Sequence, residues 1–159
     1  DGWTLDMPLP QPYDAHIQAG QMVQDYLREV GINAEIRIVE WGVWLSDVYG
    51  EARAFDITVI GHTGKLDPSG RLDGYGVESG NYTGYDALVT ADLIAEGARV
   101  SDLARRQEVY GEALRRIHDA APFIFFGTPG RAYATQANVE GFWITPLLDS
   151  FDFRTASKN

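Results

Sequence analysis

The sequence predicts an α/β fold in which a mixed, mostly parallel sheet is flanked by helices. Apolar and polar residues alternate over two short runs, 3–8 and 32–38, and apolar residues at helical spacing fill 13–30 between them. A second helical stretch, 41–49, then leads into the apolar run 55–60. A strand, a helix and a strand in this order form a βαβ unit, whose two strands are expected to be parallel.

Composition limits the classes of function. The 159 residues are enough for one domain with its own core. The 23 acidic and 13 basic residues give a net charge of −10, so a nucleic-acid partner is not expected, because phosphate binding needs a basic face. The absence of cysteine excludes disulfides, thiolate metal sites and a cysteine nucleophile. The three histidines are scattered without the spacing of metal ligands, so we expect no metal and no cofactor.

The first half of the chain contains clear element boundaries. We expect the strand 3–8 to be stopped by Pro8 and Pro10, and the helix 13–30 to end at Gly31. The helix 41–49 is expected to end near Gly50. The glycine-rich stretch 61–84 has no hydrophobic period, and we place no helix or strand in it.

The second half predicts two helices and a buried strand. Asp86 is expected to cap the first helix, and the second helix runs to about Ala120. We interpret the charged residues of the second helix as a solvated face; they are Arg105, Arg106, Glu108, Glu112, Arg115 and Arg116. The aromatic run Phe123–Phe126 is expected to be a strand buried on both sides.

The C-terminal residues carry many large apolar side chains without a regular period. They are Phe142, Trp143, Ile144, Leu147, Leu148, Phe151 and Phe153. Side chains of this kind need a surface to cover, and we expect that surface to be sequence absent from this chain. The chain also begins with Asp1 rather than Met, which we interpret as the start of a piece of a longer protein.

The end of the run 55–60 is the candidate binding site. In open α/β sheets, ligands lie beyond the carboxyl ends of strands. Here the apolar run is followed by the polar or flexible residues Gly61, His62, Thr63, Lys65 and Asp67. The alternative is an ordinary solvated loop.

Five segments, in this order, resemble one known family. They are GIxAEIxxxEW at Gly31–Trp41, FDIxxxGxT at Phe55–Thr63, SGNYTGY at Ser79–Tyr85, AxRxxxYxxAxxxIxxxAPxI at Ala104–Ile124, and a closing Val-Glu-Gly-Phe at Val139–Phe142. Together they resemble the C-terminal lobe of the peptide/nickel-type (family 5) extracytoplasmic solute-binding proteins of ABC transporters.

The resemblance implies a lobe of the type II periplasmic-binding-protein fold. Residues 1–127 would form the second lobe, and residues 128–159 a tail that returns to the missing N-terminal lobe. The whole protein would be the substrate-binding component of an ABC importer, periplasmic or lipid-anchored on the outer face of the membrane. It would close by a hinge motion on a small or peptide-like solute and deliver it to the transmembrane subunits of the permease.

The family's site residues are carried over one position at a time. Trp41 would line the solute cavity, or alternatively pack in the core at the start of its helix. Apart from the resemblance, Tyr82 is a candidate for a further aromatic surface because it lies in the glycine-rich loop; the alternative is an exposed tyrosine without a function. Gly61–Thr63 would offer its backbone to an extended ligand. Many peptide receptors have an aspartate that pairs with the ligand's ammonium, and here Lys65 lies near that position, although Asp67 could take the role.

The lysine changes the expected cargo. A lysine repels an ammonium and favours a carboxylate or another acceptor, so an ordinary di- or oligopeptide receptor is not expected. The alternative is that Lys65 is a solvated loop charge, and the solute itself stays unidentified.

Other classes of function are weaker. An enzyme using His62 and Asp67 is not expected, because the sequence has no G-x-S-x-G elbow, phosphate loop or HExxH motif. A stand-alone ligand-sensing or protein-interaction domain derived from this lobe remains an alternative. We also expect the isolated chain to self-associate through its apolar tail.

Overall fold

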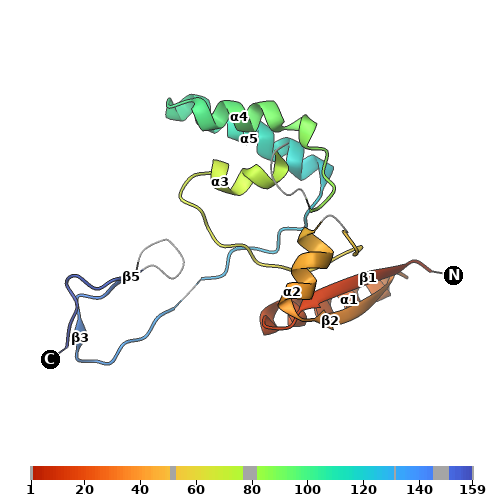
Figure 1. The fold of residues 1–159 in the computed structure, drawn as a ribbon, viewed down its shortest axis with the longest axis horizontal. Helices are drawn as coiled ribbons and strands as arrows, with labels where there is room; N and C mark the ends of the chain where they lie inside the picture. Colours follow the sequence, from red (N-terminus) through yellow and green to blue (C-terminus); the bar gives the residue numbers. More distant parts are fainter. Residues whose placement is uncertain (1, 51–52, 77–81, 131, 145–150, 159) are drawn as a thin grey trace. The chain divides into compact units, whose positions relative to one another are not determined.

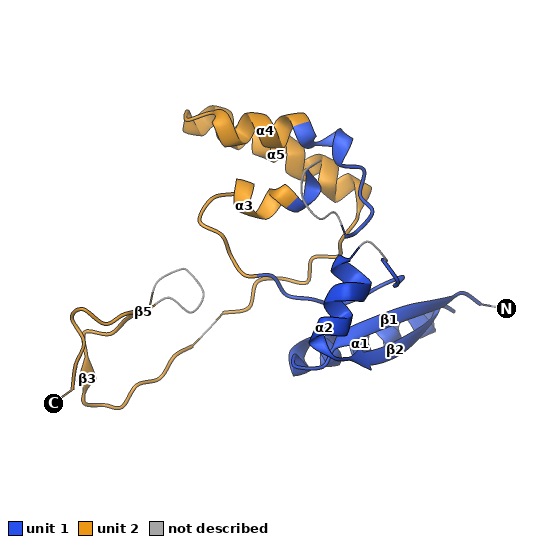
Figure 2. Ribbon diagram, in the orientation of Figure 1, with its two compact units in different colours: residues 1–62, 74–91 blue, residues 63–73, 92–159 orange. Residues whose placement is uncertain are grey.

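The computed structural model of the chain contains two compact units (Figures 1 and 2). Unit 1 consists of Asp1–His62 and Gly74–Ala91, and unit 2 of Thr63–Asp73 and Asp92–Asn159. These units do not separate the chain at residue 127, because unit 2 contains residues on both sides of it. The predicted division into a lobe, 1–127, and a tail, 128–159, therefore stays a prediction. The structure describes residues 2–50, 53–76, 82–130, 132–144 and 151–158.

Unit 1 is built on the predicted βαβ unit. Strand β1 (Thr4–Pro10) and strand β2 (Asn33–Val39) are parallel, with Thr4 opposite Asn33 and Pro10 opposite Val39. Helix α1 (Asp14–Glu29) connects them and lies along one face of the pair (Figure 1). Gly31 follows α1 with φ of +83°, a conformation that favours glycine, as the sequence predicted.

The core of unit 1 lies between α1 and the strand pair. A methyl group on Gly20 of α1 would come within 2.5 Å of the Leu9 side chain, so only glycine allows the helix to approach this closely. The buried residues are Met7, Leu9, Ala34 and Val59, with Ile17, Val23, Leu27, Ile36 and Ile57 packed against them.

Helix α2 confirms the predicted helix after β2. It covers Trp41–Trp44 and continues as a wider, π-helical turn, η1, at Leu45–Tyr49 before Gly50. The Glu40 carboxylate caps its start by accepting hydrogen bonds from the N–H groups of Gly42 and Val43, at 2.7 and 3.3 Å. The Trp44 side chain is fully buried.

The two prolines do not stop β1, which corrects the sequence prediction. The strand continues through Pro8 to Pro10, and the prolines instead disrupt pairing with the next segment, Phe55–Ile60. The backbone carbonyl of Asp6 accepts hydrogen bonds from the N–H groups of Asp56 and Ile57, at 3.1 and 3.2 Å. Alternate residues of a strand face the same edge, so Pro8 and Pro10 face this segment as well, without an N–H to donate. The prediction of a strand at 55–60 was therefore wrong: in the described part of the chain this segment runs beside β1 but belongs to no strand.

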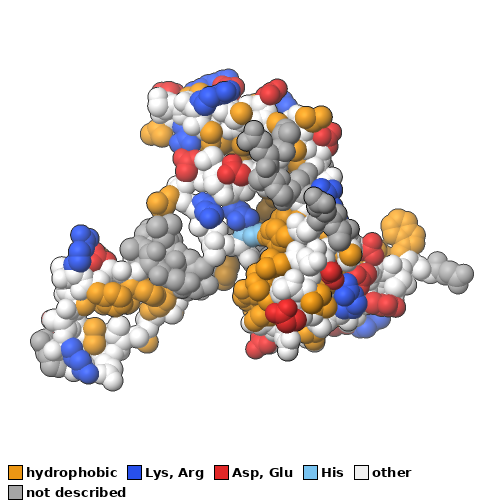
Figure 3. Space-filling model, viewed as in Figure 1, with side chains coloured by type: hydrophobic (Ala, Val, Ile, Leu, Met, Phe, Trp, Pro, Cys, Tyr) orange, Lys and Arg blue, Asp and Glu red, His pale blue; other side chains and the backbone are white. Residues whose placement is uncertain are grey.

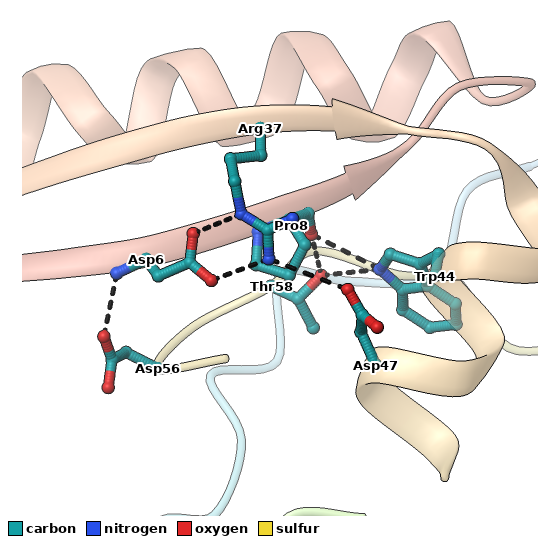
Figure 4. A network of polar contacts seen from close by, with 7 residues as sticks. All are labelled: Asp6, Pro8, Arg37, Trp44, Asp47, Asp56 and Thr58. Carbon is teal, nitrogen blue, oxygen red and sulfur yellow. Dashed lines mark hydrogen bonds and ion pairs between the residues drawn. The ribbon is translucent and has the colours of Figure 1, made fainter. Parts of the chain in front are cut away.

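The carbonyl of Pro8 is bound by side chains instead (Figure 4). It accepts hydrogen bonds from the Thr58 hydroxyl at 2.6 Å and from the Trp44 indole N–H at 3.3 Å. The indole N–H also lies 3.1 Å from the Thr58 oxygen. We call these three residues the Pro8 clamp. It connects β1, α2 and the segment that leads to Gly61.

An ion-pair network borders the Pro8 clamp. Arg37 of β2 binds both carboxylate oxygens of Asp6, at 2.6 and 2.8 Å, and lies 3.8 Å from Asp47 (Figure 4). The hydrogen bond from Arg37 is the main reason that the pKa of Asp6 lies below its ordinary value. The network joins both strands to the turn after α2.

Helix α4 (Ala91–Arg99) and helix α5 (Leu103–Ala120) confirm the two predicted helices. Asp102 caps α5 by accepting from the Arg105 N–H at 2.8 Å. Asp86 does not cap α4; it caps the short 3₁₀ turn η3, Ala87–Val89, that precedes it. The glycine-rich stretch contains the short helix α3 (Ser69–Leu72) and the 3₁₀ turn η2 (Asp73–Tyr75). The first three residues of the SGNYTGY motif, 79–81, lie outside the described residues.

The prediction for Phe123–Phe126 was wrong. In the described part of the chain these residues belong to no strand, and the side chains of Ile124, Phe125 and Phe126 are 77, 68 and 63% exposed. A strand needs a neighbour to complete its hydrogen bonds, and an apolar pattern does not show which segment supplies one.

The tail forms short antiparallel pairs. Strand β3 (Val139–Glu140) pairs with β6 (Ser157–Lys158), and β4 (Trp143–Ile144) pairs with β5 (Phe151–Asp152). Strands this short have no readable period, which explains why the sequence predicted none. Leu147 and Leu148 of the predicted apolar tail lie outside the described residues.

The Pro8 clamp gives a first prediction. Thr58→Val keeps the shape of the side chain but removes the hydroxyl that donates to Pro8, so it should lower the free energy of unfolding by about 1 kcal/mol. Urea denaturation followed by tryptophan fluorescence measures this change. Thr4→Val, the same change at an exposed position of β1, is the control and should shift stability by less than about 0.5 kcal/mol. Equal effects of the two variants would contradict the role of the clamp.

Candidate functional site

A histidine from α1 holds the chain at Gly61, where the segment Phe55–Ile60 ends. The Gly61 N–H donates to His16 Nε2 at 3.0 Å, and a methyl group on Gly61 would lie 2.9 Å from the same nitrogen. The accepting nitrogen must be unprotonated, in agreement with the effect of burial, which lowers the pKa of His16. Sequence reasoning gave His16 no role, because a single histidine early in a helix has no distinguishing pattern.

His62 lies between two tyrosines. Its Nε2 is 2.6 Å from the Tyr82 hydroxyl, and both ring nitrogens are 3.3 Å from the Tyr49 hydroxyl. The rings of Tyr49 and Tyr82 lie 4.2 Å apart. We call these three residues the His62 cluster. The structure thus brings together two predicted site residues, His62 and Tyr82, and adds Tyr49, whose position in an apolar helix stripe looked like that of a core residue.

Trp41 belongs to the same run of aromatic rings. It stacks on Trp44 at 5.2 Å with an interplanar angle of 8°, and its edge contacts Tyr13 at 5.2 Å. Trp44 in turn contacts Tyr49 at 5.4 Å, so in the described part of the chain Trp41 is linked to His62 through two intervening rings. These contacts agree with the packing alternative for Trp41, while its predicted contact with a ligand stays a prediction.

The other predicted site residues belong to unit 2. Thr63 and Lys65 are exposed, while Asp67 is partly buried. Asp67 accepts hydrogen bonds from the backbone N–H and hydroxyl of Ser69, at 3.0 and 2.7 Å. Both its oxygens also accept from Arg106 Nη2, at 2.9 and 2.8 Å. The hydrogen bonds from Ser69, followed by those from Arg106, lower the pKa of Asp67 from 3.8 to about 2.

Arg106 differs from the solvated residue that the sequence predicted. Its side chain is only 21% exposed, its Nε–H donates to the Gly97 carbonyl at 2.9 Å, and its guanidinium lies 5.3 Å from the Tyr110 ring. The prediction of a solvated face is confirmed for Arg105, Glu112 and Arg115, which form exposed ion pairs. The exception could not be seen in the sequence, because Asp67 is 39 residues from Arg106.

Two further observations concern the described residues as a set. They contain no group of three or more histidine, cysteine or acidic side chains placed to hold a metal ion. None of the described helices combines the length and the apolar character needed to cross a membrane.

Comparison with known proteins identifies the family. Over 145 residues the chain is 32% identical to di/tripeptide-binding protein 4 of Pseudomonas aeruginosa, a match that covers 87% of this chain and 27% of that protein. The solved structure of the oligopeptide-binding protein AppA of Bacillus subtilis, in complex with a nonapeptide, matches 99% of this chain and 32% of its own, with a TM-score of 0.82 and 21% identity. The chain belongs to the peptide/nickel-type (family 5) solute-binding proteins. No protein-family model matches it.

A second solved structure supports the fold of this family 5 chain. The dipeptide binding protein of a Pseudoalteromonas species, in complex with Met-Leu, matches 99% of the chain with a TM-score of 0.73 and 17% identity, over 32% of its own length. The α/β class and the lobe of the type II periplasmic-binding-protein fold, both predicted from the sequence, are confirmed. The chain spans between 27 and 32% of the length of these relatives, so it corresponds to only part of each.

The ionisation of Asp67 gives a second prediction. Because its folded-state pKa is lowered to about 2, its contacts stabilise the fold fully above pH 4 or so and lose that effect as the pH falls through about 2. The carboxyl carbon of Asp67, followed by NMR during an acid titration, should show this low pKa, and Ser69→Ala should raise it. Ser101→Ala is the control and should leave it unchanged. A pKa near 3.8 in the unsubstituted protein would contradict the observed contacts.

Proposed function

We propose that residues 1–127 form the second, C-terminal lobe of the substrate-binding component of an ABC importer. This component captures a small, peptide-like solute and delivers it to the transmembrane subunits of the permease. The relationship to di/tripeptide-binding protein 4 along 87% of the chain carries the proposal. The partial coverage of the relatives supports the view that a first lobe supplies the rest of the binding cleft.

The chain around Gly61, at the end of the segment Phe55–Ile60, is the proposed point of contact with the solute. Gly61 and His62 are both exposed, so an extended ligand can approach this part of the backbone. The irregular edge at Phe55–Ile60 provides backbone groups for an extended ligand, as in strand addition. The His62 cluster and Trp41 supply aromatic surface, and the chain continues through Thr63 to Lys65. Recognition of this kind needs no catalysis and no cofactor.

Lys65 is the proposed determinant of cargo charge. In the described part of the chain no acidic side chain pairs with Lys65, whereas Asp67 is bound to Arg106 and Ser69. An exposed ammonium without a partner favours a carboxylate of the cargo. Asp67 is less suited to bind an ammonium, because both its oxygens already accept hydrogen bonds.

The tail is the proposed contact with the missing lobe. Hydrophobic side chains are exposed on the surface of the segment that contains β5 (Figure 3). Trp143 and Phe153 are 65 and 63% exposed, and the run before the tail exposes Phe125 and Phe126. Exposed apolar groups of this number indicate an interface. Residues 128–159 would return to the first lobe, in a protein that is periplasmic or lipid-anchored outside the membrane.

Cargo binding gives a third prediction. The full-length protein, screened by thermal shift against peptides, amino-acid derivatives, sugars and metal chelates, should be stabilised by peptides that carry a carboxylate. Lys65→Ala should weaken binding of these peptides about tenfold, since the lost bond is charge-assisted. Lys158→Ala removes the other lysine of the chain and should leave the affinity unchanged. Stabilisation by sugars or chelates alone, without any peptide, would contradict the proposed function.

The exposed tail gives a fourth prediction. Without a first lobe, the isolated 159-residue chain should self-associate at low micromolar concentration in sedimentation velocity experiments. Trp143→Ser combined with Phe153→Ser should reduce the association, because both side chains are exposed. A clean monomer of the unsubstituted chain would show that the tail is not an unsatisfied interface.

A further inference from the structure

Arg106 contacts three separate parts of unit 2. It binds the Asp67 carboxylate, donates to the carbonyl of Gly97 in α4, and lies over the ring of Tyr110 in its own helix. Its side chain is 21% exposed, whereas those of Arg105 and Arg115 on the same helix are 48 and 68% exposed. A guanidinium held from several sides is an anchor rather than a solvated charge.

The segment Thr63–Asp73 rests on this anchor. Asp67 binds the backbone and side chain of Ser69, the first residue of α3, and at the same time binds Arg106. The stem of Lys65 lies against α3, because a methyl group on Gly70 would be 3.4 Å from its Cβ and Cγ atoms. Lys65 is therefore connected to α5 through α3, Asp67 and Arg106.

We propose that Arg106 is a positioning residue for cargo selection, which holds the segment Thr63–Asp73 on the helix pair and neutralises Asp67 so that Lys65 acts as the charged contact. This inference rests on the proposed function and deepens it. It gives Arg106 of α5 a role that the sequence did not predict, because the charged residues of this helix had the pattern of a solvated face. It also accounts for the presence of an aspartate two residues from Lys65 in a segment that favours anionic cargo.

Removing the Arg106 guanidinium should weaken the preference for carboxylate-bearing cargo in two ways. The segment loses its anchor, so Lys65 is no longer held in place. Asp67 also loses its cationic partner and becomes an uncompensated negative charge beside Lys65. A carboxylate-bearing cargo should then bind more weakly, while a neutral cargo should change little. A residue with only a structural role would weaken both kinds of cargo equally.

The test compares matched peptide pairs on the full-length protein by calorimetry. Trialanine against its C-terminal amide probes the terminal carboxylate, and Ala-Glu-Ala against Ala-Gln-Ala probes a side-chain carboxylate. In the unsubstituted protein, at least one pair should show a preference for the carboxylate. Arg106→Ala should reduce that preference by up to about fivefold, the upper end of the range for a partly exposed ion pair. Arg105→Ala removes an exposed arginine whose ion pairs among the described residues are with Glu96 and Glu108, and it should leave the preference unchanged.

A second measurement covers the case in which Arg106→Ala is too unstable to test. Arg106→Lys keeps the charge but loses the geometry of the guanidinium, so it should also reduce the preference. In the absence of peptide it should speed hydrogen exchange in residues 63–73 while leaving β1 unchanged. An unchanged preference together with unchanged exchange would overturn the inference and leave the proposed function intact. If the unsubstituted protein bound none of the four peptides, the proposed function itself would fail.

Discussion

The missing N–H of Pro8 is the constraint on which unit 1 depends. A strand next to β1 would need that donor, so Phe55–Ile60 cannot complete a regular ladder, and the Pro8 carbonyl binds Thr58 and Trp44 instead. These side-chain hydrogen bonds replace the backbone hydrogen bonds of a regular ladder, and the one from Trp44 also connects α2 to the strand pair. As a result, the chain reaches Gly61 on a firmly held path.

In unit 2, ion pairing determines which charged side chains remain available. The chain carries a net charge of −10, yet the segment after His62 exposes Lys65, which pairs with no acidic side chain among the described residues. The nearby Asp67 would cancel that charge if it were free. Arg106 and Ser69 bind it, so its negative charge is compensated within unit 2. Local ion pairing therefore leaves a cationic side chain exposed in a strongly acidic protein, as the proposed role of Lys65 requires.

Local patterns in the sequence predicted much of the fold. The parallel βαβ unit, the end of α1 at Gly31 and the end of α5 near Ala120 follow from periodicity and capping. The order of five weak motifs predicted the family. The sequence could not predict contacts between distant residues, such as Asp67 with Arg106 or His62 with Tyr49, because no local period connects them. The exposed run Phe123–Phe126 shows a further limit, since an apolar pattern predicts burial but does not identify the covering surface.

We propose that the cargo binds around Gly61, where the segment Phe55–Ile60 ends. Hydrogen exchange followed by mass spectrometry, on the full-length protein with and without a saturating peptide, tests it most directly. The account predicts that the peptide slows exchange in residues 58–67, because the ligand pairs with this backbone and covers the segment after it. Full occupancy by the peptide with unchanged exchange in residues 58–67, and protection elsewhere in the chain, would contradict the account.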